Sequence, residues 1–398
     1  MTQGASSARP RPLDGVVVVD LTRVLAGPFC TMTLAQQGAR VIKVEVPGRG
    51  DDSRAFGPFV KGRSLYFAGV NCGKESIALD LRRSADAAVF ERLLDRADVL
   101  VENFRPGTLA AFGFPPSRLA ERWPRLVYAH VTGFGHTGPL AQRPAYDVVV
   151  QAMGGLMSVT GHEGQPPVRV GVSIGDLTAG LYLAFAVAGA LNRRAQDGRG
   201  CRIDVSMLDC QAALLEADLT GWLNAGVMPR KRGTRNPYIA PFQAFRSADG
   251  HFVLAAGNDR LFQELCRVLE RPDLAADPRY RTNDDRVRNV DLLEAELETT
   301  LATRPTAEWL RILEAAQLPC GPVQSIDQVA AHPQLAQRKM IVEVPDRALG
   351  TLRVPGNPVK IDGVPDVPPS CSAPELDADR EAIMEWLGIP ATEACRAG

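Results

Sequence analysis

Residues 16–47 decide the fold class, and they read VVVVDLTRVLAGPFCTMTLAQQGARVIKVEVP. Residues 16–21 are almost continuously apolar and β-branched, which is typical of a strand buried on both faces. Residues 29–39 follow a Gly-Pro pair with the pattern of a helix that ends near a glycine. Residues 40–47 return to the pattern of a strand. The stretch therefore predicts a β-α-β unit with parallel strands.

The same alternation continues along the next part of the chain. Ser84 can cap a helix whose apolar side chains are spaced for one face, namely Val89, Phe90, Leu93, Leu94 and Ala97. Strand patterns follow at residues 98–104, 125–131 and 202–207. Strands that alternate with helices predict an α/β fold with a parallel sheet covered on both faces.

The segment VMPRKRGTRNP at residues 227–237 is basic and contains prolines, and we place a domain boundary there. Beyond it, residues 251–258 have a strand pattern and residues 260–317 are mostly helical in pattern. Short strand patterns begin near residue 340, and residues 375–389 predict a final helix. We expect a second, smaller domain in the middle of the chain.

The composition is that of an ordinary soluble protein, with 398 residues, 45% hydrophobic residues and a net charge of −1. No global field attracts the chain to nucleic acid or to an anionic membrane, so we expect neither as a partner. The eight cysteines form no CxxC pair, which indicates reduced thiols in the cytoplasm and no metal site. The N-terminus has no apolar stretch typical of a secretory signal, although its arginines leave a transit peptide as an alternative.

Several common catalytic motifs do not account for this sequence. The segment GFGHTG at residues 133–138 matches GxGxxG, but Pro139 and Pro144 follow it where a dinucleotide site needs a helix. We therefore interpret it as a loop that lets a ligand approach the backbone. The sequence has no GxSxG elbow, no HExxH motif and no P-loop, and its five histidines stand singly.

Asp176 is the single acid in RVGVSIGDLTAG, residues 169–180. It precedes an apolar run, LTAGLYLAFAVAGALN, which we interpret as a buried core helix too short to span a membrane. One interpretation of Asp176 is an ordinary cap of that helix. The other is a carboxylate nucleophile, because Gly171, Gly175 and Gly180 would let a bulky substrate reach it.

Six blocks, in this order along the chain, resemble the family III CoA-transferases. They are residues 13–54, residues 70–82 (VNCGKESIALDLR), residues 98–114 (DVLVENFRPGTLAAFGF), residues 131–147 (VTGFGHTGPLAQRPAYD), the Asp176 block, and residues 240–259 followed by LPCGPV. The resemblance extends from about Leu13 to the last helix. It implies an enzyme that moves CoA from an acyl-CoA to a carboxylic acid.

The resemblance also implies the catalytic role of Asp176. In the implied mechanism its carboxylate attacks the acyl-CoA thioester to form a mixed anhydride. CoA thiolate then converts the anhydride into an aspartyl-CoA thioester, which the acceptor carboxylate attacks. The resemblance implies no metal and no tightly bound cofactor, with CoA itself as substrate and product.

The family's CoA-contacting positions fall at strand ends and in loops of this sequence. They correspond to Val24, Ala26, Val46, Leu79, Arg82, Asn103, Phe104, Phe112 and Tyr146. Val46 and Ala111 stand where formyl-CoA transferases have arginines, so some phosphate contacts must come from elsewhere. Arg105 and Arg143 are candidates for those contacts by their placement alone.

Three segments, DLTRVLAGP, GDDSRAFGP and RGTRNPYIAPFQAF, resemble the succinyl-CoA–glutarate CoA-transferase branch of the family. A dicarboxylic acceptor needs a cation for its far carboxylate, for which Arg23, Arg54 and Arg235 are candidates. Related α-methylacyl-CoA racemases have a histidine where this chain has Tyr146, a poor proton shuttle near neutral pH. A racemase-like isomerase and an inactive CoA-binding scaffold remain the alternatives.

The family fold implies a Rossmann-like large domain built from residues 1–225 and 331–398, with a small α+β domain at residues 226–330. It also implies a homodimer of two interlocked subunits.

Overall fold

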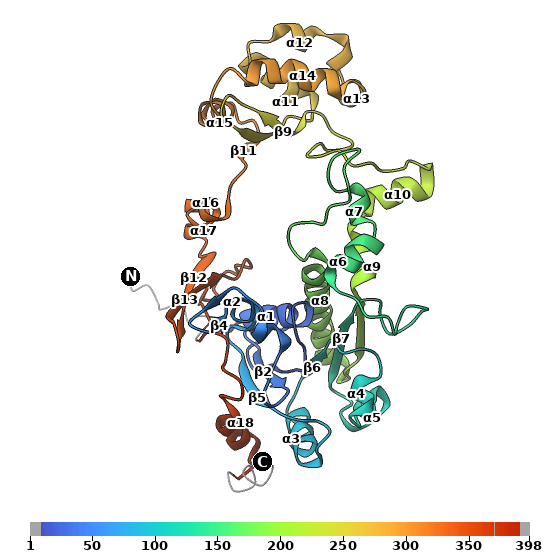
Figure 1. The fold of residues 1–398 in the computed structure, drawn as a ribbon, viewed down its shortest axis with the longest axis vertical. Coiled ribbons are helices and arrows are strands. Elements are labelled where there is room, and N and C mark those ends of the chain that lie inside the picture. Colours follow the sequence, from blue (N-terminus) through green and yellow to red (C-terminus); the bar gives the residue numbers. More distant parts are fainter. Residues whose placement is uncertain (1–8, 370, 391–398) are drawn as a thin grey trace. The chain divides into compact units, whose positions relative to one another are not determined.

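The computed structural model describes residues 9–369 and 371–390, so the N-terminal residues that bear on a targeting signal lie outside the described residues. The described chain forms two units (Figure 1). The first comprises residues 9–156, residues 169–226 and the described residues between 333 and 390, and the second comprises residues 157–168 and 227–332. We predicted residues 157–168 in the large domain, whereas they belong to the second unit. The reason is local pairing, since Gly233 N–H donates to Gly161 O at 2.8 Å.

The first unit is built on a parallel six-stranded sheet in the order β5-β2-β1-β6-β7-β8. The strands are β1 (Val17–Asp20), β2 (Arg40–Glu45), β5 (Glu75–Ala78), β6 (Val99–Glu102), β7 (Val127–Thr132) and β8 (Arg202–Ser206). In sequence order this is the doubly wound arrangement 3-2-1-4-5-6, whose order reverses between β1 and β6. The predicted parallel α/β sheet is confirmed. Ligands of such sheets bind at the carboxyl ends of the strands, at the reversal point.

Successive side chains of each strand enter two different cores. Val18 packs with Val127 on one face of the sheet, while Val19 packs with Tyr128 on the other. The first face is covered by α1 (Ala26–Gln36), α8 (Ile174–Asp197) and α9 (Met207–Leu214). The second face is covered by α3 (Ser84–Leu94), α5 (Pro116–Arg122) and α18 (Arg380–Leu387). Both faces of the sheet are therefore buried, which explains the continuous apolar strand patterns.

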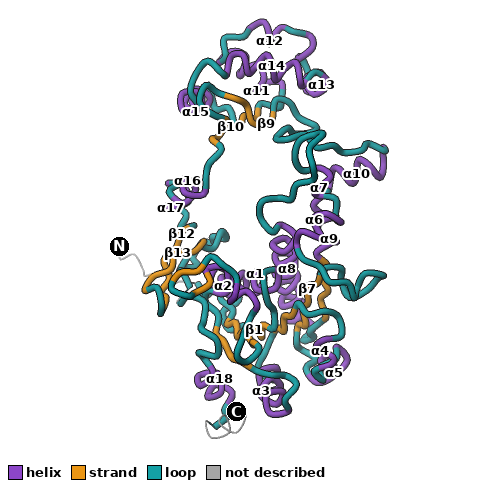
Figure 2. Tube along the Cα trace, viewed as in Figure 1, coloured by secondary structure: helices purple, strands orange, loops and turns teal. Residues whose placement is uncertain are grey.

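The last helix returns to the sheet from the far end of the sequence (Figure 2). The Ser76 amide on β5 donates to Asp379 Oδ2 at 2.8 Å, and Ile383 and Leu387 are fully buried in the second core. The remaining elements of the first unit are short. They are β3 (Phe59–Val60), β4 (Arg63–Ser64), α2 (Leu65–Asn71), α4 (Thr108–Ala111), α6 (Asp147–Met153), α10 (Glu216–Ala225), α17 (Pro333–Gln337), β12 (Ile341–Asp346), β13 (Gly350–Pro355) and the 3-10 turn Asp52–Ala55.

Helix α8 is longer and less buried than we predicted. It spans 24 residues, and its length and composition alone would allow it to cross a membrane. Core helices of soluble proteins can have the same length and composition, so this is weak evidence for a membrane span. One face packs on α1, α6, α9, β7 and β8, with Leu183 and Val187 fully buried. The other face exposes Leu181, Tyr182 and Phe185, the last at 79%. The expectation of a wholly buried helix is therefore wrong for the single chain.

The second unit packs helices against a three-stranded antiparallel sheet of β9 (Phe242–Arg246), β10 (His251–Ala255) and β11 (Cys320–Pro322). Its core contains Phe245, Phe252 and Trp309. The guanidinium of Arg286 is buried there and donates to the carbonyls of Ala240, Tyr280 and Gly257. Its helices are α11 (Asp259–Val268), α12 (Pro272–Ala276), α13 (Asn283–Arg288), α14 (Val290–Leu301), α15 (Thr306–Ala315) and α16 (Ile326–Ala330), with a 3-10 turn at Pro278–Tyr280; the short α7 (Leu156–Val159) begins where the chain enters this unit.

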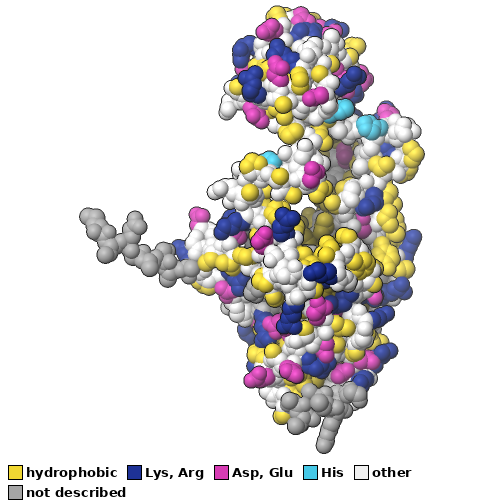
Figure 3. Space-filling view, turned by 60° about the vertical axis from the view of Figure 1, so that its left-hand side comes forward, with side chains coloured by type: hydrophobic (Ala, Val, Ile, Leu, Met, Phe, Trp, Pro, Cys, Tyr) yellow, Lys and Arg dark blue, Asp and Glu magenta, His cyan; other side chains and the backbone are white. Residues whose placement is uncertain are grey.

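Basic and acidic side chains are interspersed over the face of the molecule that Figure 3 shows. This distribution is consistent with the net charge of −1. The structure describes seven cysteines, the first at Cys30 and the last at Cys371, and all seven are free thiols.

Candidate functional site

Asp176 lies in the first turn of α8, which begins two residues earlier at Ile174. It is therefore a helical residue and does not occupy the cap position, which belongs to Ser173. One of the free amides of the first turn is satisfied by another residue, because Gly175 N–H donates to Asp147 Oδ1 at 2.8 Å. Among the residues that the structure describes, none hydrogen-bonds the Asp176 carboxylate. The interpretation of Asp176 as a helix cap is therefore not supported.

Asp147 belongs to a buried hydrogen-bonded brace beneath this turn. Its Oδ2 accepts from Gln151 Nε2 at 2.7 Å, and Gln151 Oε1 accepts from the Val170 amide at 2.8 Å. Gln151 is fully buried and Asp147 is nearly so. The brace holds the backbone on both sides of residue 173 against α6, so the position of Asp176 is determined by side chains from another helix.

The electrostatic environment of Asp176 disfavours its charged form. Burial and then the nearby negative charge of Asp147 raise the pKa of Asp176 to about 7. Burial and then the charges of Asp176, Asp51 and Asp147 raise the pKa of Tyr66 to about 12, which places the Tyr66 phenol near the same carboxylates. A carboxylate with a raised pKa and no hydrogen-bond donor is a strong nucleophile once it ionises.

Two of the glycines around Asp176 have a packing role that we did not predict. A Cβ at Gly180 would lie 2.6 Å from the carbonyl oxygen of Ala26, so this glycine lets α8 approach the start of α1. A Cβ at Gly175 would lie 2.9 Å from Asp147 Oδ1. A Cβ at Gly171, in contrast, would have no described atom within 4 Å. Close packing, more than access for a substrate, explains these two glycines: the backbone of α1 approaches Gly180, and the Asp147 side chain approaches Gly175.

The loop after β1 is held in a strained conformation at the reversal point of the sheet. Val24 has φ of +69°, which is unfavourable for a β-branched residue. Its amide donates to Asp51 Oδ1 at 3.0 Å. Asn103, after β6, accepts from the Arg23 amide and donates to the Arg23 carbonyl. Side chains from two other segments therefore determine this loop.

Buried ion pairs support the loop from below. Lys43 pairs with Asp51 at 2.9 Å, and Lys74 pairs with Asp20 at 3.0 Å, with all four side chains wholly buried. Burial lowers the pKa of Lys74 to about 8 although Asp20 opposes this. Burial alone would raise the pKa of Asp51, but Lys43 lowers it to about 2. These charges are structural, because each already has a partner.

A cavity of about 300 Å³ lies at the carboxyl ends of β1, β2, β5 and β6. Six predicted site residues line it: Arg23, Val46, Leu79, Arg82, Phe104 and Phe112. The cavity lies where the doubly wound sheet predicts a ligand site. Arg49 also lines it and was not predicted, although a loop that directly follows β2 at this edge is a recognisable signal.

The other predicted CoA contacts do not line this cavity. Ala26 is buried at the start of α1, and Arg105 is exposed after β6. The Arg143 guanidinium lies 5.8 Å from the centre of the Phe134 ring. Tyr146 is 73% exposed immediately before α6, and therefore next to Asp147. Their contacts with CoA stay predictions.

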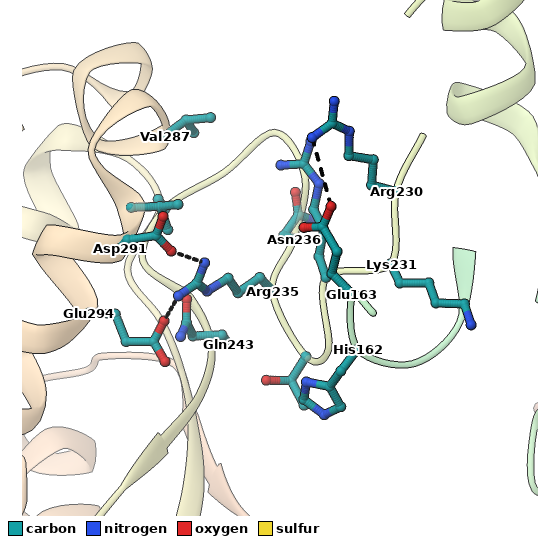
Figure 4. Close-up of a pocket in the computed structure, with 14 residues that line it drawn as sticks. His162, Glu163, Arg230, Lys231, Arg235, Asn236, Gln243, Val287, Asp291 and Glu294 are labelled. Carbon is teal, nitrogen blue, oxygen red and sulfur yellow. Dashed lines mark hydrogen bonds and ion pairs between the residues drawn. The ribbon is translucent and has the colours of Figure 1, made fainter. Parts of the chain in front are cut away.

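The three arginines predicted to bind a substrate carboxylate all have carboxylate partners. Arg23 pairs with Asp52 at 3.0 Å, and Arg54 binds both oxygens of Glu45. Arg235 belongs to the second unit, where it pairs with Asp291 and Glu294 (Figure 4). It lines a polar cavity of about 530 Å³ there. A substrate carboxylate would have to compete with these partners.

The described part of the chain contains no group of three or more His, Cys, Asp and Glu side chains suited to a metal ion.

Comparisons with known proteins agree with these observations. A family model described as CoA-transferase family III matches residues 13–380. The chain is 46% identical to acetyl-CoA:oxalate CoA-transferase of Acetobacter aceti, over 98% of this chain and 99% of that protein. It is 39% identical to human succinyl-CoA:glutarate CoA-transferase, over 88% of this chain and 80% of that protein. The crystal structure of a CAIB/BAIF family protein from Brucella suis matches with a TM-score of 0.84 and 37% identity, over 95% of this chain and all of that one.

Proposed function

The chain belongs to CoA-transferase family III, and we propose that it transfers CoA from an acyl-CoA to a dicarboxylic acid through covalent intermediates on Asp176. We expect succinyl-CoA as the donor. The observation that carries the proposal is the Asp176 carboxylate itself. Asp147 fixes the preceding Gly175 amide, no residue in the described part of the chain donates a hydrogen bond to the carboxylate, and its pKa is raised to about 7.

In the first half of the reaction, an oxygen of the ionised Asp176 attacks the thioester carbonyl of the donor. The C–S bond breaks, and CoA leaves as the thiolate while a mixed anhydride forms. The thiolate then attacks the aspartyl carbonyl, the anhydride C–O bond breaks, and the donor acid leaves as its carboxylate. Asp176 is now an aspartyl-CoA thioester.

In the second half, the acceptor carboxylate attacks this thioester and displaces the thiolate, which gives an anhydride between Asp176 and the acceptor. The thiolate attacks the acceptor carbonyl, so the acceptor leaves as its CoA thioester and the Asp176 carboxylate is restored. The cycle consumes no proton. Water must be kept from both anhydrides, because hydrolysis would end the transfer.

The residues around the sheet cavity support CoA binding in this proposal. Val46, Leu79, Phe104 and Phe112 offer apolar and aromatic surface for the adenine ring. We also keep Val24, Ala26, Asn103, Arg105, Arg143 and Tyr146 as proposed contacts of CoA.

The dicarboxylate class is supported by the names of the relatives, since oxalate and glutarate both carry two carboxylates. For the far carboxylate of the acceptor we propose Arg23 before Arg54 and Arg235. Its side chain is 47% exposed and its partner Asp52 is also accessible, whereas Arg54 is bound bidentately and 17% exposed. Exchange of partners is therefore easiest at Arg23.

Acyl-CoA exchange followed by chromatography tests the proposal. Succinyl-CoA and acetyl-CoA are offered with glutarate, oxalate and other dicarboxylates, and with formate and carnitine as other acceptors. We expect new acyl-CoA from a dicarboxylate with the wild type and with Asp197→Asn, a control at the far end of α8. Asp176→Ala should show none, and exchange that survives this substitution would overturn the mechanism. Deuterium uptake at the α-carbon without an acceptor would indicate the racemase-like alternative, and CoA binding without turnover would indicate a scaffold.

We also propose that the enzyme is a cytoplasmic homodimer with interlocked subunits. The exposed apolar side chains of α8 are suited to burial against a second copy. One chain has a mass of 42.9 kDa, and light scattering should give twice that mass. A monomer at micromolar concentration would contradict this proposal.

A further inference from the structure

Arg49 lies in a turn at the end of β2 whose shape is well determined. The Gly50 amide donates to the Val46 carbonyl at 2.9 Å, and the Asp51 amide donates to Glu45 Oε2 at 2.9 Å. Gly48 and Gly50, on either side of Arg49, have φ of +79° and +69°, which favours glycine at both positions. The turn places Arg49 in the lining of the sheet cavity.

The charges that line this cavity are otherwise compensated. Four acids line it, and each has a cationic partner: Asp52 with Arg23, Asp80 with Arg82, Asp51 with Lys43, and Glu45 with Arg54. All lining residues are among those that the structure describes. Within the described chain, the Arg49 guanidinium has neither a hydrogen-bond partner nor an ion-pair partner. Arg49 is therefore the uncompensated positive charge of the cavity.

The remaining walls of the cavity suit a flat aromatic group. Val46 and Leu79 contribute apolar surface. Phe104 and Phe112 meet edge to face, with ring centres 6.3 Å apart. A ligand that satisfies both these walls and Arg49 combines an aromatic ring with an anionic group, which is the chemistry of a nucleotide.

We infer that Arg49 binds a phosphate group at the nucleotide end of CoA, and so is a binding residue that sets the affinity for CoA. This inference rests on the proposed function, because it takes CoA as the ligand. A guanidinium suits the role, since it can donate two parallel hydrogen bonds to phosphate oxygens. Arg49 is not involved in the chemistry at Asp176.

Calorimetric titration of CoA into the purified enzyme tests the inference. The variants are Arg49→Ala, Arg49→Lys and the control Arg83→Ala, which removes the same charge from an exposed residue that does not line the cavity. For Arg49→Ala we expect the Kd for CoA to rise about 10- to 100-fold, as for the loss of a charged hydrogen bond. Arg49→Lys should raise the Kd by a smaller factor, because lysine keeps the positive charge but cannot donate two parallel hydrogen bonds. The Kd of Arg83→Ala for CoA should stay within about twofold of the wild-type value.

A second titration with 3′-dephospho-CoA identifies the phosphate. If the effect of Arg49→Ala disappears with this ligand, Arg49 binds the 3′-phosphate, and if it persists, Arg49 binds the diphosphate. Both results support the inference. An unchanged Kd for CoA in a folded Arg49→Ala enzyme would overturn it, as would an equal loss in Arg83→Ala. Failure of the wild type to bind CoA would instead refute the proposed function itself.

Discussion

Replacing Asp147 with asparagine should change the ionisation of Asp176 without removing the nucleophile. Asp147 contributes negative charge next to Asp176, in addition to burial, and both raise the pKa of Asp176 to about 7. Asparagine at position 147 removes that charge and leaves the burial. The pKa of Asp176 should therefore fall, and the acidic limb of the pH–rate profile should move to lower pH.

We expect the pKa of Asp176 to fall by about one unit. This corresponds to about 1.4 kcal/mol of repulsion between the ionised Asp176 and the charge of Asp147. With a pKa that falls from about 7 to about 6, the ionised fraction at pH 6 rises about fivefold, while at pH 8 it hardly changes. The plateau at high pH should be lower in the variant, because a less basic carboxylate is a weaker nucleophile.

The substitution also affects the brace. The asparagine oxygen can still accept from the Gly175 amide, but its NH₂ group would face Gln151 Nε2, which is itself a donor. The side-chain amide of Gln151 cannot rotate by about 180° to accept this NH₂ group, because its Oε1 would then lose the hydrogen bond from the Val170 amide. We expect a loss of about 1–3 kcal/mol in the free energy of unfolding.

The assay is kcat/KM for acyl-CoA exchange between pH 5 and pH 9, with circular dichroism to verify folding. Asp197→Asn is the matched control, because it removes one carboxylate from the other end of α8, 21 residues or about 30 Å away. Its profile should coincide with that of the wild type. If the acidic limb stays in place in a folded Asp147→Asn enzyme, the charge of Asp147 does not govern the ionisation of Asp176.

Three further predictions concern stability. Because the pKa of Asp176 is raised from 3.8 to about 7 in the folded state, the wild type loses stability as pH rises between these two values. Asp176→Asn should therefore be about 4 kcal/mol more stable than the wild type at pH 8, and the difference should fall below about 1 kcal/mol at pH 4, by urea denaturation. Lys74→Met leaves the Asp20 carboxylate buried without that partner and should lower the free energy of unfolding by about 3–5 kcal/mol, whereas a loss under 1 kcal/mol would contradict the structural role of the pair. Gly180→Ala should lower the melting temperature through its contact with α1, while Gly69→Ala, in α2 with open space around its Cβ, should raise it slightly.

The sequence alone was sufficient for the features that depend on local pattern. Residues 16–47 predicted strand, helix and strand because a strand buried on both faces and a helix ended by glycine leave a local signature. Asp176 was singled out because it stands alone among glycines ahead of an apolar helix. The ordered blocks of the family added its identity.

The tertiary structure decided which side chains meet, because those contacts join segments far apart in the chain. Asp147 and Gln151 support the start of α8 from another helix, and nothing near Tyr66 in sequence indicated that it would approach Asp176. Folding also decides which arginines are paired. It leaves Arg49 without a partner in the described chain, whereas two guanidinium nitrogens of Arg54 already bind Glu45. Charge in a sequence is a property of single residues, whereas the availability of that charge to a substrate depends on the neighbours that folding supplies.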